Sequence, residues 1–236
     1  MKPSPETLSS SAERQAPLAL MKNLVLFFFA CTAVFPQAAD YANSGYKTKE
    51  GRERVGQTLS AHDRETTQKP KDLVENLKLK AGMTVADIGT GVGYMLPFLH
   101  AAVGPAGKIV AEDIFPDFLA RARENATAKG LDNVAFVQGT EKDPHLPAAS
   151  IDLALVLDVY HHFDYPAEML AGIAKGLKPD GRLAIVDFYQ SGFRDPKHIR
   201  LDEPDVIKEL EANGFQLIST GVFTPNRQYL ALFRKK

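Results

Sequence analysis

The sequence predicts an α/β domain built on a doubly wound, mostly parallel seven-stranded sheet that ends in an antiparallel C-terminal hairpin. Short apolar runs rich in β-branched residues alternate along the chain with segments whose apolar residues recur at helical spacing. Five of these runs are apolar almost throughout, which is typical of parallel strands that helices cover on both faces. The last two runs are joined by the short turn 221–227, so we expect them to pair antiparallel at the edge of the sheet.

Each expected element has its own signal in the sequence. The first helix, 70–79, begins at Pro70, and the first strand, 83–89, is a β-branched run that ends in glycine. The last helix, 204–213, is closed by Gly214. The remaining expected helices are 92–103, 116–129 and 166–177, and the remaining strands are 108–114, 133–139, 151–159, 181–189, 215–220 and 228–234.

Length and composition suit one globular domain. The chain has 236 residues, of which 44% are hydrophobic and 24% are charged, so it can form a large core. The formal net charge is -1, and no run of lysines and arginines is long enough to follow a phosphate backbone. We therefore expect no nucleic-acid partner, and the sequence shows neither an internal repeat nor a second domain.

The beginning of the chain is predicted to be a leader outside this domain. A start at Met21 would place one lysine before the apolar run 24–35, and small residues follow it, as in a secretory signal peptide cleaved near Ala38 or Ala39. The run is short for a membrane span. A buried helix, a short anchor or lipid modification of Cys31, the only cysteine, are the alternatives. A genuine signal peptide would make the protein exported, to the periplasm, and otherwise it would be cytoplasmic.

The stretch VADIGTGVGY places Gly89, Gly91 and Gly93 directly after the first buried strand, with Asp87 just ahead of them. Ligands of doubly wound sheets bind at the carboxyl ends of the strands, and glycines there let a ligand approach the backbone. A dinucleotide-binding loop would have a glycine where Tyr94 stands. A carboxylate so close disfavours a pyrophosphate and favours a positively charged ligand. The loop therefore predicts a cationic ligand that carries no phosphate.

This stretch closely resembles the first motif of the class I S-adenosylmethionine-dependent methyltransferases, which have a Rossmann-like fold. Three later segments resemble further motifs of that family in the same order, namely GKIVAEDIFPDFL (107–119), residues 136–163 and GLKPDGRLAIVDF (176–188). Four motifs at family spacing are a specific signal, and the resemblance implies that S-adenosylmethionine is the cofactor. It divides the chain into a leader (1–39), an N-terminal extension (40–68) and a methyltransferase domain (69–236).

The resemblance also implies which residues bind the cofactor. Asp113 ends the second strand and matches the family's acid that accepts hydrogen bonds from both ribose hydroxyls. Where the family usually has an aspartate for the adenine amino group, this chain has Gly139, Thr140 and Glu141, so Glu141 or the Thr140 backbone is the expected substitute. The expected cofactor-binding residues are Asp87, Gly89, Thr90, Gly91, Gly93, Asp113, Ile114, Thr140, Glu141 and Asp158.

The segment DVYHH follows the fourth strand, where this family places groups near the transferred methyl. His161 or His162 is the expected general base, with Asp158 beside it, although such histidines can also be structural. No metal is expected, because two adjacent histidines and Asp164 rarely converge on one ion. The expected substrate-side residues are Tyr160, Asp187 and Tyr189, with His198, Arg200 and Tyr229 as weaker candidates.

The predicted function is methyl transfer to a small-molecule acceptor, to which the protein contributes mainly proximity, in-line orientation and exclusion of water. The chain resembles most the branch of the family that includes quinone-biosynthesis enzymes. The D/N-P-P-Y/F signature of nucleobase amino methylation is absent after the fourth strand, and the domain has no cysteine to attack cytosine. The alternative is a non-catalytic relative that binds a nucleoside or another ligand. We expect no stable membrane span in the mature domain, and the oligomeric state is left open.

Overall fold

The computed structural model describes residues 37–60 and 64–236, which belong to one compact unit. Residues 1–36 of the predicted leader (1–39) lie outside the described residues. The boundaries of the leader and of the N-terminal extension therefore stay predictions. Within the described ranges, no helix is both long enough and apolar enough to cross a membrane.

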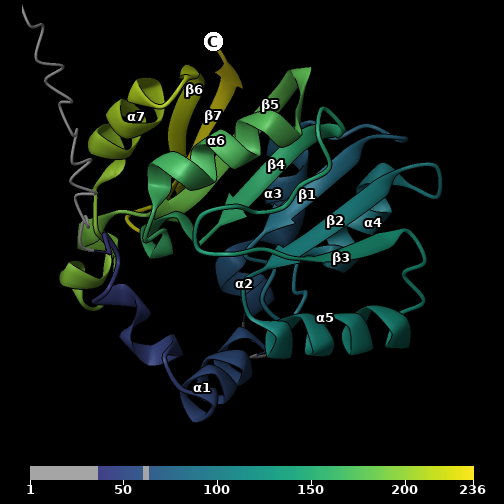
Figure 1. Cartoon of the computed structure of the whole chain (residues 1–236), viewed down its shortest axis with the longest axis horizontal. Coiled ribbons are helices and arrows are strands. Elements are labelled where there is room, and N and C mark those ends of the chain that lie inside the picture. The colour runs from purple at the N-terminus through teal and green to yellow at the C-terminus, as the bar shows by residue number, and fades with distance from the viewer. Residues whose placement is uncertain (1–36, 61–63) are drawn as a thin grey trace, which may run out of the picture. The chain divides into compact units, whose positions relative to one another are not determined.

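Helices and strands largely alternate along the described chain from residue 70 onward, except that β4 follows β3 and β7 follows β6 directly (Figure 1). The strands are β1 (Thr84–Ile88), β2 (Lys108–Asp113), β3 (Val134–Gln138), β4 (Ile151–Leu157), β5 (Leu177–Phe188), β6 (Phe215–Thr224) and β7 (Gln228–Lys235). The α-helices are α1 (Lys49–Leu59), α2 (Arg64–Gln68), α3 (Pro70–Leu77), α4 (Leu96–Val103), α5 (Pro116–Ala128), α6 (Pro166–Gly176) and α7 (Glu203–Ala212). Single 3-10 turns are η1 (Ala42–Tyr46), η2 (Tyr160–His162), η3 (Gln190–Gly192) and η4 (Pro196–His198).

The described strands form one seven-stranded sheet in the order β3-β2-β1-β4-β5-β7-β6. Strands β1 to β5 pair in parallel, and β7 runs antiparallel to both β5 and β6. The predicted doubly wound sheet with its C-terminal hairpin is therefore confirmed. The chain reverses its direction of winding between β1 and β4, so ligands are expected at the carboxyl ends of these two strands.

Helices cover both faces of the sheet. Apolar side chains of α3, α4 and α5, such as Leu73, Leu96 and Ala122, form one core cluster with one face of the strands. Side chains of α6 and α7, such as Leu170 and Leu210, form a second cluster with the other face. Figure 1 shows α6 in front of the sheet and α3 and α4 behind it. The strands are thus buried on both sides, as their apolar composition predicted.

Several element boundaries differ from the predicted ones, and two of these differences have identifiable reasons. The helix expected from residue 92 begins at Leu96, because the preceding glycine loop has positive φ angles that no helix contains. Strand β6 continues to Thr224 instead of ending at residue 220, because it keeps pairing with β7 as far as Gln228 through two register shifts. The connection between β6 and β7 is therefore shorter than the predicted turn 221–227.

The last residues of the predicted leader and the described part of the N-terminal extension pack on the carboxyl edge of the sheet. The backbone N–H groups of Ala38 and Ala39 donate to the main-chain oxygen and the carboxylate of Asp164, at 3.1 and 3.0 Å. Farther along, Arg52 Nε lies 2.7 Å from Asp117 Oδ2, at the start of α5. These contacts hold η1 and α1 over the loops that follow β2 and β4.

Candidate cofactor and active site

A cavity of about 440 Å³ lies at the carboxyl edge of the sheet, beside the switch between β1 and β4. Its walls come from the loops after β1, β2 and β4 and from the N-terminal segment that covers them. This volume lies within the range of small-molecule sites, roughly 300–1,000 Å³. The predicted site residues that line it are Gly89, Thr90, Gly91, Asp113, Ile114, Glu141, Asp158 and His162.

The glycine loop after β1 needs glycine for its backbone and for its contacts. Gly89 and Gly91 have φ angles of 68° and 56°, in the left-handed region that side chains disfavour. A Cβ atom at Gly89 would lie 2.6 Å from a methyl carbon of Val159, and one at Gly91 would lie 3.0 Å from Leu59. Gly93 lies outside the cavity, and a Cβ atom there would meet Leu96 at 2.9 Å. Gly93 therefore serves packing of the loop against α4.

The carboxylate of Asp113 is fixed by backbone hydrogen bonds. Gly91 N–H donates to one carboxylate oxygen and Phe115 N–H to the other, each at 2.9 Å. Burial raises the pKa of Asp113 to about 6, although these hydrogen bonds act in the opposite direction. The end of β2 thus presents to the cavity the oriented and buried carboxylate of Asp113.

Two further aspartates lie at the ends of β1 and β4. Asp87 is buried, does not line the cavity, and accepts a hydrogen bond from the Thr90 hydroxyl at 2.7 Å, so it acts on the cavity through Thr90. Asp158 lines the cavity and accepts from the Gln228 amide at 2.6 Å, with a strained φ of 57°. Burial raises the pKa of each aspartate to about 6, and the charge of Asp187 adds to the effect at Asp158.

Glu112 is a lining residue that the sequence analysis missed. Its Oε2 accepts the Gly89 N–H at 3.2 Å, and its Oε1 is buried and has no hydrogen-bond partner in the described part of the chain. Burial and the charge of Asp113 hold the pKa of Glu112 well above its ordinary range. Side chains alternate along a strand, so a motif that assigns Asp113 to the ligand gives no signal for its neighbour. Three buried carboxyl groups, those of Glu112, Asp113 and Asp158, therefore line one cavity.

The N-terminal segment contributes a cation that no motif signalled. Arg64 lines the cavity, its guanidinium lies 4.2 Å from the ring centroid of Tyr94, and its Nη1 donates to the Leu59 carbonyl at 3.0 Å. Burial lowers the pKa of Arg64, and the charges of Asp158 and Asp87 offset this effect in part. Residues 40–68 match none of the family motifs, so sequence reasoning had no signal for this arginine.

The two adjacent histidines face different surroundings. His162 lines the cavity, and its Nδ1 lies 2.8 Å from Asn43 Oδ1. Burial and the neighbouring His161 and His198 lower the pKa of His162 well below its ordinary value. His161 is buried, and its Nδ1 lies 2.7 Å from Asp187 Oδ1. The general-base role stays a prediction, and of the two histidines His162 is the one that lines the cavity.

The other predicted residues do not line this cavity, so their assigned roles stay predictions. Tyr160 is buried and donates to Glu209 Oε2 at 2.5 Å. Asp187 accepts the backbone N–H of His161 at 3.0 Å. Tyr189 packs on Tyr229 with ring centroids 5.5 Å apart. Thr140 Oγ1 accepts the Asp143 N–H at 3.0 Å in an exposed turn, and Arg200 pairs with Glu209 at 2.6 Å. Of the predicted adenine-side pair, Glu141 therefore lines the cavity and Thr140 shapes its loop.

The chain is similar in sequence to several methyltransferases. It is 31% identical over 157 residues to the protein-L-isoaspartate O-methyltransferase of Ignicoccus hospitalis, covering 66% of this chain and 69% of that protein. It is 28% identical over 145 residues to the uncharacterized methyltransferase YcgJ of Bacillus subtilis, covering 54% of each. It is also 28% identical over 120 residues to the ubiquinone/menaquinone biosynthesis C-methyltransferase UbiE of Ectopseudomonas mendocina, covering 50% of this chain and 47% of that protein. The chain thus spans about half the length of the last two relatives.

A solved structure and a family model agree with these sequence similarities. The structure is similar to the crystal structure of a SAM-dependent methyltransferase from Aquifex aeolicus, with a TM-score of 0.72 and 27% identity over 76% of this chain and 96% of that chain. The chain matches the methyltransferase domain family over residues 79–219, which is more than half of its length. It therefore belongs to the methyltransferase domain family, and its resemblance to the class I S-adenosylmethionine-dependent enzymes is confirmed.

Proposed function

We propose that this protein transfers the methyl group of S-adenosylmethionine to a small-molecule acceptor. The observation that carries the proposal is the set of buried carboxyl groups that converges on the cavity at the switch between β1 and β4. Burial raises the pKa of Asp113 and of Asp158 to about 6, and at Asp158 the charge of Arg64 only partly offsets this effect. A bound cation would offset this cost, and S-adenosylmethionine carries both an ammonium and a sulfonium group.

The residues around the cavity fit the parts of this cofactor. Asp113 has both oxygens directed by backbone N–H groups and can accept the ribose hydroxyls, and Glu141 lines the same cavity and is available to adenine. Asp158 offers negative charge to the cationic end. Arg64 lines the same cavity and offers its guanidinium to the carboxylate of the cofactor's methionine part. The Oε1 of Glu112, which has no hydrogen-bond partner among the described residues, is a further polar atom available to a ligand hydroxyl or amino group.

The role of the chain in transfer is to hold the two reactants in line and keep water out. When bound, the cofactor supplies a methyl group already activated by the positive sulfur. Holding reactants in the right geometry lowers the barrier without any group that must react covalently. The segment around η1 and α1 closes the cavity from outside, since Asn43, Tyr46 and Leu59 line it. Its volume of about 440 Å³ favours a small acceptor over a macromolecule.

Calorimetry with the purified full-length chain tests the proposal. We expect S-adenosylmethionine and its demethylated product, S-adenosylhomocysteine, to bind at micromolar strength, and labelled methyl to be transferred to a member of a panel of quinols, phenols, thiols and amines. Binding without transfer to any acceptor of these classes would favour the alternative, a non-catalytic relative of the fold. Absence of binding to both compounds would contradict the proposed methyl transfer and would leave only a relative that binds another ligand.

The affinity for S-adenosylmethionine should rise with pH. In the free protein, the pKa values of Asp87, Asp113 and Asp158 are raised to about 6. Because the folded state then holds these protons more tightly than the unfolded state, the contribution to folding stability is full below about pH 4 and is lost as the pH rises through 6. The cationic ligand binds the ionised carboxylates, so protonation opposes binding. We expect affinity to be about tenfold weaker at pH 5 than at pH 7.5 for each carboxylate that must ionise.

Titration calorimetry at constant ionic strength between pH 5 and 7.5 measures this dependence. S-adenosylhomocysteine is the matched control, because it keeps the ammonium and lacks the positive sulfur. Its affinity should change less with pH than that of S-adenosylmethionine. Equal and flat profiles for the two compounds would show that the buried carboxylates do not respond to the charge of the ligand.

A further inference from the structure

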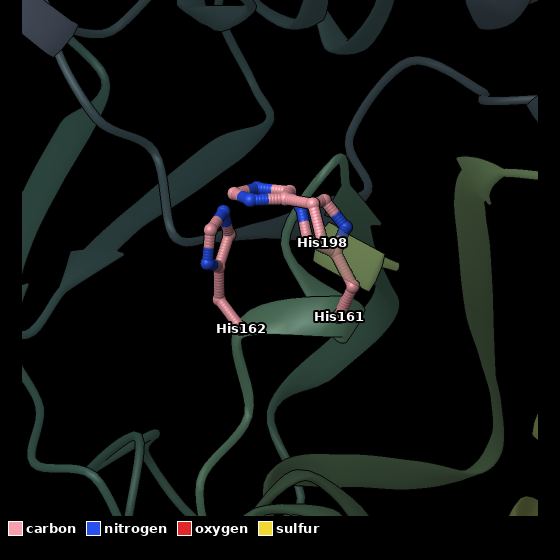
Figure 2. Close-up of side chains that lie close together, drawn as sticks. All are labelled: His161, His162 and His198. Carbon is pink, nitrogen blue, oxygen red and sulfur yellow. The ribbon is translucent and has the colours of Figure 1, made fainter. Parts of the chain in front are cut away.

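Three histidines from distant parts of the sequence meet beside the cavity wall. His161 and His162 lie on η2, and His198 lies on η4 (Figure 2). One ring nitrogen from each residue lies within 4.8 Å of one from each of the others. The ring centroids of His161 and His162 are 4.1 Å apart, and that of His198 is 5.1 and 5.2 Å from them. The rings are thus close enough for one ion to contact all three.

The surroundings of His161 fix which of its nitrogens is free to bind an ion. Asp187 accepts the backbone N–H groups of His161 and Phe188 at 3.0 and 2.8 Å, so its carboxylate is held in place. The same carboxylate lies 2.7 Å from His161 Nδ1. An acceptor at this distance requires the proton on Nδ1, which leaves the lone pair on Nε2. Metal-binding histidines commonly have this arrangement, in which a carboxylate orients the ring.

A second network fixes the tautomer of His162. Asn43 Nδ2 donates to the His162 carbonyl at 3.0 Å and to Asp164 Oδ2 at 2.9 Å, so the amide oxygen of Asn43 must face the imidazole. That oxygen lies 2.8 Å from His162 Nδ1, which therefore carries the proton. The lone pair of His162 is on Nε2. Asp164 accepts from Asn43 and so orients that amide, and it is not one of the groups that meet at the histidine cluster.

His198 supplies the third imidazole from a loop that is anchored on both sides. Its ring stacks on Phe193, with centroids 4.8 Å apart and an interplanar angle of 8°. Asp195 caps η4 by accepting the Lys197 N–H at 3.1 Å, and Tyr41 donates to the same carboxylate at 2.7 Å. No hydrogen bond to the His198 side chain is found among the described residues. Both of its ring nitrogens are therefore free of protein partners there.

We propose that His161, His162 and His198 bind one divalent transition-metal ion of the zinc class. Imidazole nitrogens suit zinc and its neighbours, whereas calcium and magnesium require oxygen ligands. Tetrahedral nitrogens at the usual Zn–N distance of about 2.0–2.1 Å lie roughly 3.4 Å apart, so small ring rotations would complete the site. Three protein ligands leave a coordination position open, as in reactive rather than structural zinc sites. Because His162 lines the cavity, the ion would lie at its wall.

Binding of zinc to the metal-free, full-length chain without a polyhistidine tag tests this proposal. We expect one ion per chain, measured by competition with a chromophoric chelator, and a raised Tm in the presence of zinc. Cobalt in place of zinc should give the visible absorption of a nitrogen-coordinated, four- or five-coordinate ion. His198→Gln and His162→Gln should each weaken binding by at least about tenfold, the lower bound for loss of even an orienting partner.

His145→Gln is the matched control, because His145 is exposed and bonds the Gln138 carbonyl away from the cluster. It should leave affinity and stoichiometry unchanged. His198 lies on an outer 3-10 turn, so its variant tests the site even where a substitution at the more buried His162 prevents folding. No bound zinc, or equal affinity in wild type and in every folded histidine variant, would overturn the proposal. The experiment uses no S-adenosylmethionine, so its outcome does not depend on the proposed function.

Discussion

Gly91→Val is expected to abolish binding of S-adenosylmethionine, with a loss in affinity of at least about a hundredfold, or about 2.7 kcal/mol. Gly91 lines the cavity at a φ of 56°, and even a Cβ atom there would lie 3.0 Å from Leu59. The two γ-methyl groups of valine would either fill ligand space or push the loop away. The Gly91 N–H also donates to Asp113, so a displaced loop would release that carboxylate.

The fold should survive this substitution. A left-handed backbone costs a residue with a side chain about 1–2 kcal/mol, against a total stability of about 5–15 kcal/mol for a typical domain. Gly130→Val is the matched control, because Gly130 has a φ of 66° with open space around it and does not line the cavity. Circular dichroism and thermal unfolding should show similar losses of stability for the two variants. Tight binding by Gly91→Val would mean that the loop is only a turn.

The sequence predicted the sheet well because the signals for it are local. Each parallel strand is a compact β-branched run, and the order of helices and strands then leaves few topologies. The errors fall at element ends, where tertiary contacts decide. Strand β6 extends to Thr224 because β7 provides backbone hydrogen-bond partners for it. Helix α4 begins only at Leu96 because the glycine loop that precedes it must first turn over the cavity.

The candidate site was predictable only where it follows a motif. Gly89, Gly91, Asp113 and Asp158 line the cavity because their positions after β1, β2 and β4 follow from the fold. Arg64 lines it only because α1 and α2 fold back over the sheet, and nothing in residues 40–68 indicated this.

The histidine cluster shows the same limit at longer range. A pair of adjacent histidines could not indicate a metal site, because the third imidazole comes from His198 in another loop. The orienting groups, Asn43 and Asp187, come from two further segments of the chain. Only the packing of η1, η2 and η4 on one another brings these side chains together, and no local sequence pattern encodes that packing.

Asp113→Ala is expected to weaken binding of S-adenosylmethionine by roughly 1.5–3 kcal/mol, or about 10- to 150-fold. The substitution removes a carboxylate proposed to accept the ribose hydroxyls through charge-assisted hydrogen bonds. It also leaves the Gly91 and Phe115 N–H groups without their acceptors, which loosens the loop in the free protein. Asp113→Asn should give a smaller loss, because an amide oxygen can still accept one of these bonds. Asp132→Ala, at an exposed position, is the control and should leave affinity unchanged.

A direct contact can be separated from a loosened loop by changing the ligand as well as the protein. The wild-type chain should bind S-adenosylhomocysteine more tightly than its 2′-deoxy analogue, because one hydroxyl that Asp113 accepts from is gone. In Asp113→Ala that difference should shrink toward zero, since the two changes remove the same interaction and are not additive. If the loop alone were responsible, the variant would bind both ligands more weakly by the same factor. Calorimetry on the two proteins with the two ligands decides between these outcomes, and a preserved difference would remove Asp113 from the ribose site.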